Sequence, residues 1–191
     1  MATLAVAAII CLSACYDNMV PTDTFHPYCD SSSIGDDIFC QTDNRQLTFH
    51  RQAGFASAEY QHMSDTLYGS YDTTVLNVTY HSTPIYDGPD ETDIIFQKAS
   101  VPSGLVGITW CENAATWVKC DQHYVRFKSG YSVSRALACH ESGHAVGLTH
   151  GSDAAPKQSD RAPSLECLRN PIQYATESLG SHNRDAVDAT Y

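Results

Sequence analysis

The most informative stretch of the sequence is residues 140–150, which read His-Glu-Ser-Gly-His-Ala-Val-Gly-Leu-Thr-His. On a helix, His140 and His144 are one turn apart, so their imidazole rings project from the same face. Gly147 can end that helix with a positive φ angle, and the chain can then bring His150 back toward the other two rings. Three imidazoles suit one zinc ion and leave a fourth position for water, which is typical of a catalytic rather than a structural site. We therefore predict one catalytic Zn²⁺ held by His140, His144 and His150.

Glu141 directly follows the first predicted ligand. Its carboxylate can reach a water molecule at the metal without occupying the metal itself, which is the role of a general base in zinc hydrolases that carry this motif. Glu141 is therefore the predicted catalytic residue. The residue frequencies give the complete pattern a chance occurrence of about one in 10⁴ or lower in a chain of this length.

The pattern resembles that of the metzincins, a clan of zinc endopeptidases that includes the matrixins, serralysins and astacins. Ala145, Gly147 and Leu148 make the local sequence most similar to matrixins and serralysins, and the chain as a whole looks like a secreted bacterial enzyme of the matrixin type. Gly151, directly after the third histidine, is not the residue that marks the familiar subfamilies, so the subfamily stays open.

This resemblance covers residues from about 45 to 191 and implies an α+β fold. The expected architecture is a twisted mixed β-sheet with a backing helix, a helix that carries the zinc ligands and a short C-terminal helix. The implied activity is hydrolysis of internal peptide bonds of proteins by a zinc-activated water. The resemblance also implies that residues 104–110 form the upper rim of the cleft and that residues 171–174 line the pocket for the side chain after the cut bond.

One departure from the family concerns the methionine that metzincins place in a tight turn beneath the zinc. This chain has methionines only at positions 1, 19 and 63, and the best candidate for the turn, residues 167–171, puts Leu168 at that place. Exchanges between leucine and methionine usually cost less than about 1.5 kcal/mol, so a loss of activity does not follow. Leu168 still supports an alternative, in which the chain is a catalytically idle, metzincin-like zinc-binding protein that acts as a binding module.

Hydrophobic periodicity along the chain predicts strands alternating with helices. We expect strands over residues 47–50, 74–81, 92–97, 105–111 and 123–127, and helices over residues 57–68, 132–146 and 181–189. Ser132 or Ser134 is the expected N-cap of the helix that carries the ligands. Residues 46–191 are thus predicted to form the catalytic domain.

The cysteines predict a disulfide framework, because an even set in an exported chain is typical of one. Six cysteines allow 15 pairings, and local spacing favours Cys29 with Cys40 and Cys111 with Cys120, which leaves Cys139 with Cys167. A zinc cluster is the weaker alternative because no Cys-x-x-Cys occurs. The last of these pairs would join the ligand helix directly to the turn that contains Leu168.

The N-terminus has the apolar core and small residues of a signal peptide, predicted over residues 1–14. No lysine or arginine precedes the apolar core, and the alternative is a buried N-terminal element. Residues 12–15 resemble a bacterial lipobox, in which Cys15 would be lipidated, whereas plain cleavage after Ala14 is the equal alternative. Residues 15–45 are then an N-terminal arm with a disulfide loop. We expect an extracellular protein that is either secreted or attached to the cell surface by a lipid anchor.

The composition restricts the partners. There are 22 acidic and 11 basic residues, which gives a net charge of −11, and no basic run occurs, so nucleic acid is excluded as a partner. The longest apolar stretch, residues 2–14, is shorter than the roughly 20 residues that span a membrane, so membrane contact is expected only through a lipid at Cys15. The acidic segment 87–93 could bind Ca²⁺ through oxygen ligands, although a solvated turn is favoured. The expected partners are protein or peptide substrates, bound by a monomer.

Overall fold

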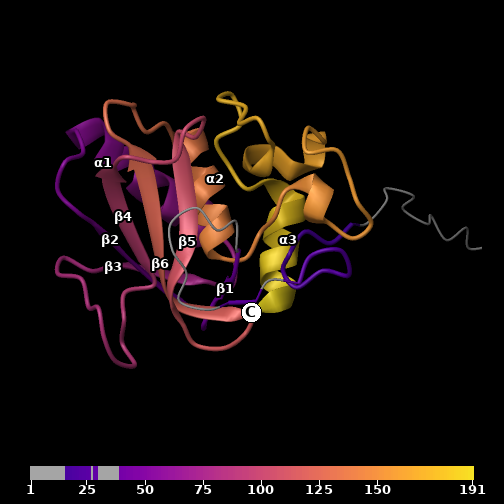
Figure 1. Ribbon diagram of the computed structural model, residues 1–191, viewed down its shortest axis with the longest axis horizontal. Helices are drawn as coiled ribbons and strands as arrows, with labels where there is room; N and C mark the ends of the chain where they lie inside the picture. The colour runs from indigo at the N-terminus through magenta and orange to yellow at the C-terminus, as the bar shows by residue number, and fades with distance from the viewer. Residues whose placement is uncertain (1–15, 27, 30–38) are drawn as a thin grey trace, which may run out of the picture.

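The structure is a computed structural model that describes residues 16–26, 28–29 and 39–191. The predicted signal peptide and Cys15 lie outside the described residues. A β-sheet forms one side of the molecule, the ligand helix α2 lies against it, and α3 lies farther away among the irregular C-terminal segments (Figure 1).

The sheet has six strands in the order β1-β6-β4-β2-β3, with β5 paired to β6. Every pairing is parallel except β5 with β6, which is antiparallel. The strands are β1 (Gln41–Thr42), β2 (Gln46–Arg51), β3 (Asn77–Tyr80), β4 (Ile94–Ala99), β5 (Gly107–Ala114) and β6 (Lys119–Lys128). A mixed sheet combined with several helices is compatible with the predicted α+β class.

Three α-helices and three shorter helical segments complete the described elements. They are α1 (Ser57–Thr66), the π-helical turn η1 (Leu67–Tyr71), α2 (Arg135–Ala145), the 3₁₀ segments η2 (Gly151–Asp153) and η3 (Pro163–Leu168), and α3 (Gly180–Thr190). Ser134 caps α2, because its Oγ accepts a 3.1 Å hydrogen bond from the Leu137 N–H. Gly147 follows this helix with φ +93°, the left-handed conformation predicted for the chain reversal. No helix among the described residues has the length and apolar character needed to cross a bilayer.

The observed strands differ from the predicted ones mainly in the β5–β6 hairpin. Pairing in this hairpin continues beyond the predicted ends at 111 and 123, through a bulge next to Cys111, to residues 114 and 120. The polar side chains in this extension hide the alternation on which the prediction depended. The short strand β1 was missed, since two residues within a polar arm carry no periodic pattern.

The main core lies between the sheet and the helices. It contains fully buried side chains from the sheet and from both helices that cover it, including Phe49 and Phe96 from the sheet, Met63 from α1 and Leu137 from α2. The start of the arm packs into the same core, because Asp17 and Met19 form antiparallel bridges with Ala155 and Leu148. The described part of the arm is therefore integrated into the packed domain.

The three predicted disulfides are present in the structure. They join Cys29 to Cys40, Cys111 to Cys120 and Cys139 to Cys167. The first two pack together in a separate buried cluster, whereas the third lies in the main core.

Candidate metal centre

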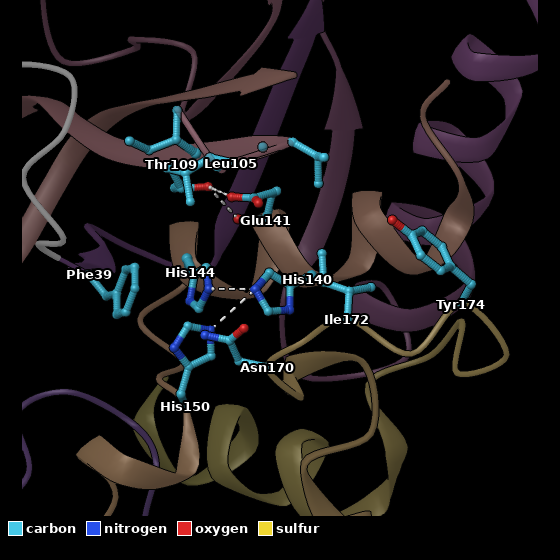
Figure 2. Close-up of a pocket in the computed structure, with 14 residues that line it drawn as sticks. Phe39, Leu105, Thr109, His140, Glu141, His144, His150, Asn170, Ile172 and Tyr174 are labelled. Atoms are coloured by element: carbon cyan, nitrogen blue, oxygen red, sulfur yellow. Dashed lines mark hydrogen bonds between the residues drawn. The ribbon is translucent and has the colours of Figure 1, made fainter. Parts of the chain in front are cut away.

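The three predicted ligands converge on one point. His140 and His144 project from α2, and His150 comes from the segment that follows Gly147 (Figure 2). The Nε2 atom of His140 lies 3.1 Å from Nε2 of His144 and 3.2 Å from Nε2 of His150. The ligand atoms of all three lie within 4.8 Å of one another, so this group could hold a metal ion.

Backbone carbonyls fix the tautomers of the two helical ligands. The His140 Nδ1 lies 2.8 Å from the carbonyl oxygen of Cys167, and the His144 Nδ1 lies 2.8 Å from that of Leu148. Because a carbonyl oxygen only accepts, each Nδ1 must carry the proton and donate it, which leaves the Nε2 lone pair directed at the centre. Metal-bound histidines usually donate the N–H of their other ring nitrogen in this way. The three imidazoles therefore fit a metal ion.

Burial keeps these imidazoles neutral. It lowers the pKa of His140 to about 3, with a further lowering from His150 and an opposing effect of the hydrogen bond to Cys167. Burial, together with the neighbouring His140 and His150, also lowers the pKa of His144 well below its usual value. Neutral imidazole is the form that binds a metal ion, and both rings are in this form at neutral pH.

Glu141 lies beside the histidines, between α2 and β5, with only 4% of its surface exposed (Figure 2). The hydroxyl of Thr109 lies 2.8 Å from its Oε2 and 2.9 Å from its carbonyl oxygen. Gly107 provides the space for the carboxylate, since a β-carbon at that position would lie 2.4 Å from Oε1. The edge strand therefore fixes where the predicted base sits relative to the ligands.

A cleft lies at the site, next to the start of β5. Residues 104–109 border one side, the three histidines and Glu141 form the base, and Asn170, Ile172 and Tyr174 close the far side. Tyr174 is 50% exposed, and its hydroxyl lies 2.6 Å from that of Tyr131. The predicted rim and pocket segments thus both reach the site.

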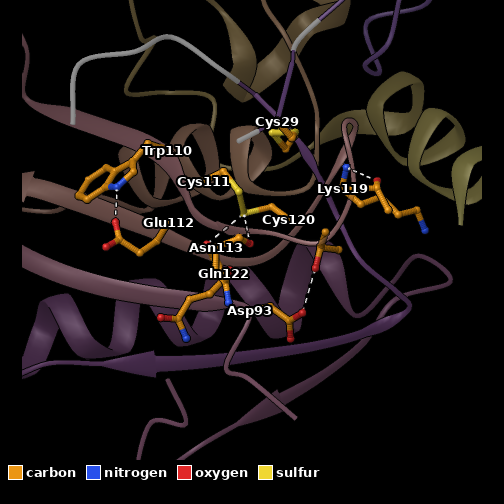
Figure 3. Close-up of a disulfide and its surroundings, with 12 residues drawn as sticks. Cys29, Asp93, Trp110, Cys111, Glu112, Asn113, Lys119, Cys120 and Gln122 are labelled. Carbon is orange, nitrogen blue, oxygen red and sulfur yellow. Dashed lines mark hydrogen bonds between the residues drawn. A yellow bond between two sulfur atoms is a disulfide. The ribbon is translucent and has the colours of Figure 1, made fainter. Parts of the chain in front are cut away.

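Trp110, the last residue of the predicted rim, does not line the cleft. It is 3% exposed, and its Nε1–H donates a 2.7 Å hydrogen bond to Glu112 (Figure 3). The structure therefore buries the Trp110 side chain instead of exposing it to the cleft.

Leu168 packs against Gly143 of the ligand helix. It is fully buried and ends η3, next to the disulfide that joins Cys167 to Cys139 of α2. The Tyr71 hydroxyl donates a 2.7 Å hydrogen bond to the carbonyl oxygen of Cys139 and supports the helix at the same level.

Phe39 also belongs to the site, although the sequence did not indicate it. Its ring is 7% exposed and stacks on His144, with centroids 3.9 Å apart and an interplanar angle of 7°. It also meets the edge of the His150 ring at 5.8 Å and 82°. Phe39 belongs to a polar arm about a hundred residues upstream, and its position next to Cys40 was the only signal in the sequence.

The remaining histidines and the acidic segment lie apart from this centre. His123 is fully buried, and burial lowers its pKa to about 3, but it does not join the three ligands. Residues 88–91 border a second cavity, which Asp43, Asp93 and Asp121 also line. In the described ranges, only the three ligand histidines form a group of three or more side chains that is compact enough to share one ion. Calcium binding at the acidic segment therefore stays a prediction.

Comparison of the sequence with family models and with curated proteins finds no match. The function of the protein therefore has to be inferred from the motif and from the geometry of this centre.

Proposed function

We propose that the protein is a zinc-dependent metalloendopeptidase of the metzincin type, which hydrolyses internal peptide bonds of proteins outside the cell. One observation carries this proposal: three Nε2 atoms converge, with Nδ1 of two of the rings donating to backbone carbonyls, beside a buried glutamate in a cleft. A purely structural zinc site would use four protein ligands, whereas among the described residues this group has three.

His140, His144 and His150 would hold the ion. When bound, zinc supplies a Lewis acid for the scissile carbonyl and lowers the pKa of water at the open position to about 7. Glu141 accepts the proton of the attacking water and delivers it to the departing amine. The Thr109 hydroxyl, 2.8 Å from Oε2 of Glu141, holds the carboxylate in the orientation that this transfer needs.

The cleft suits an extended peptide. In the described residues, β5 pairs on one side only, with β6, so its other edge can add a substrate strand through main-chain hydrogen bonds. Leu105, Ile172 and Tyr174 offer an apolar surface to the side chain that follows the cut bond. These contacts would select extended, internal segments of a protein chain.

The disulfides indicate an oxidising environment outside the cytosol. Together with the predicted signal peptide over residues 1–14, they support secretion or attachment to the cell surface. Lipidation of Cys15 belongs to the same proposal, and the mass of the mature N-terminus would test it.

The decisive experiment is digestion of a mixed peptide library by the purified protein and by the Glu141→Gln variant, both with zinc bound to the same content. We expect internal cuts by the parent and a loss of about 10²-fold or more in the variant, because general acid–base catalysis contributes that much. A zinc-loaded, folded parent that cuts nothing would contradict the proposal and favour the idle binding protein. Equal cutting by both proteins would contradict the role of Glu141.

A further inference from the structure

We propose that Phe39 is a positioning residue of the metal centre, and that the disulfide between Cys29 and Cys40 holds it there. Through this contact, the N-terminal arm sets the orientation of the His144 ring and slows the release of the metal ion. The inference rests on the metal-binding part of the proposed function and does not depend on peptide cleavage.

The Phe39 ring makes the one parallel aromatic contact with His144 among the described residues. The hydrogen bond from the His144 Nδ1 to the Leu148 carbonyl fixes one point of the ring but does not by itself set the tilt of the ring about that bond. A parallel ring at 3.9 Å restricts this rotation, because tilting the imidazole would drive it into the face of Phe39. The His140 and His150 rings also contact the His144 ring, at 4.7 and 4.8 Å, but both are nearly perpendicular to it, so Phe39 supplies the parallel packing.

Phe39 acts on two ligands at once. Its edge-on contact with His150 places one aromatic side chain against both rings that lie on this side of the centre. A phenyl ring has no atom that can bind zinc, so its effect must pass through the histidines. Phe39 also lies at the opposite end of the site from Tyr174, so a change at Phe39 leaves the Tyr174 end of the cleft intact (Figure 2).

The arm is anchored on both sides of Phe39. The Cys29 N–H donates a 2.9 Å hydrogen bond to the Trp117 carbonyl, and the Gln41 N–H donates a 3.0 Å hydrogen bond to the Val118 carbonyl. Both acceptors belong to the turn between β5 and β6, so the two ends of the arm segment share one attachment site.

The disulfide adds a covalent connection at the same place. Cys40 directly follows Phe39, and its bond to Cys29 packs against the Cys111–Cys120 disulfide of the hairpin (Figure 3). The hydrogen bonds and the disulfide together fix the backbone from which the Phe39 ring reaches His144. Loss of the Cys29–Cys40 bond should therefore have the same effect on the metal as loss of the ring.

The test measures the rate at which zinc passes from the protein to an excess of chelator, and the visible absorption spectrum of the cobalt-substituted protein. We expect Phe39→Ala to release zinc about 10-fold faster, as is usual when a partner of a metal ligand is removed, and to change the cobalt spectrum. Phe39→Leu restores volume without a planar face and should also release zinc faster, whereas Phe39→Tyr should behave like the parent. The Cys29→Ser/Cys40→Ser variant should resemble Phe39→Ala.

Phe25→Ala is the matched control. Phe25 lies in the same arm, with its ring 6.1 Å from that of Phe39, and it does not line the cleft. This variant should keep the parent's release rate and spectrum. If Phe39→Ala fails to fold, the comparison of Phe39→Leu with Phe39→Tyr decides the same question.

The outcomes separate this inference from the proposed function. A parent that binds zinc, with Phe39→Ala and Phe39→Leu releasing it at the parent's rate, would overturn the inference and leave the endopeptidase proposal untouched. A parent that binds zinc but cuts no peptide, with faster release from Phe39→Ala, would support the inference alone. A folded parent that binds no zinc would overturn both.

Discussion

Leu168 lies directly against Gly143 of the ligand helix: a β-carbon at Gly143 would be 2.9 Å from both methyl carbons of Leu168. Gly143 is positioned between His140 and His144 in α2, so Leu168 supports the part of the helix that carries two ligands. The absence of a side chain at Gly143 is what permits this approach.

Replacement of Leu168 by alanine should destabilise the protein by about 2–5 kcal/mol, since it removes a fully buried side chain and leaves a cavity under the helix. Leu168→Met should cost less than about 1.5 kcal/mol, because it conserves volume. Urea unfolding of the metal-free proteins measures both effects. A Leu168→Ala variant as stable as the parent would show that this side chain does not support α2.

A second close contact fixes the predicted base. Gly107→Ala should displace the Glu141 carboxylate, because the new β-carbon would lie 2.4 Å from Oε1. We expect kcat to fall at least about 10-fold, in line with the role of a positioned base, while the zinc content stays that of the parent because no ligand is touched. Peptide cleavage assays with metal analysis check this expectation.

Gly69→Ala is a suitable control for that substitution, since a β-carbon at Gly69 would meet no atom within 4 Å. It should keep the parent's kcat. Full activity of Gly107→Ala would mean that Glu141 can act from another position.

The part of the site that the sequence predicted is local. The i, i+4 spacing of His140 and His144 and the turn at Gly147 operate within eleven residues, so the motif alone fixes the relative positions of the ligands. Leu168 and the Cys139–Cys167 disulfide were predicted from a turn alignment and from cysteine spacing, and the structure places both under α2.

The rest of the site could not be predicted because it depends on contacts between distant segments. Thr109 and Gly107 meet Glu141 only because β5 lies across α2, and no sequence pattern at either residue predicts this contact. Phe39 reaches His144 from a polar arm whose course depends on hydrogen bonds to the β5–β6 turn. The parallel strand order is likewise a property of the whole chain.

The Cys139–Cys167 disulfide connects the ligand helix to the turn that supports it. Cys167 also accepts the hydrogen bond from Nδ1 of His140 through its carbonyl oxygen. The Cys139→Ser/Cys167→Ser variant should lose about 3–4 kcal/mol of stability, the loop-closure estimate for a separation of 28 residues. Thermal unfolding measures this loss, and unchanged thermal stability of the double variant would contradict a stabilising role.

Asp93 gives the fold a pH dependence. Burial raises its pKa to about 7, although hydrogen bonds from Thr48 and Thr42 oppose the shift, and the charge of Asp43 adds to it. Between about pH 4 and pH 7, Asp93 is therefore protonated in the folded protein but ionised in the unfolded chain, where the carboxyl pKa is about 3.9. This contribution to stability is present at low pH and is lost as the pH rises through 7.

Asp93→Asn should remove this dependence, because an amide can occupy the site without titrating. The difference in unfolding free energy between parent and variant should fall by about 3 kcal/mol from pH 4 to pH 7, as the parent loses what the bound proton supplied. The comparison uses the difference between parent and variant because His123 affects the stability of both proteins equally. Burial lowers the pKa of His123 to about 3, so this side chain stays neutral in the folded protein and reduces stability as the pH falls below about 6.5. Urea unfolding of metal-free protein at half-unit pH steps provides the measurement. A difference that does not change with pH would show that Asp93 is ionised throughout this range, and that its hydrogen bonds outweigh the effect of burial.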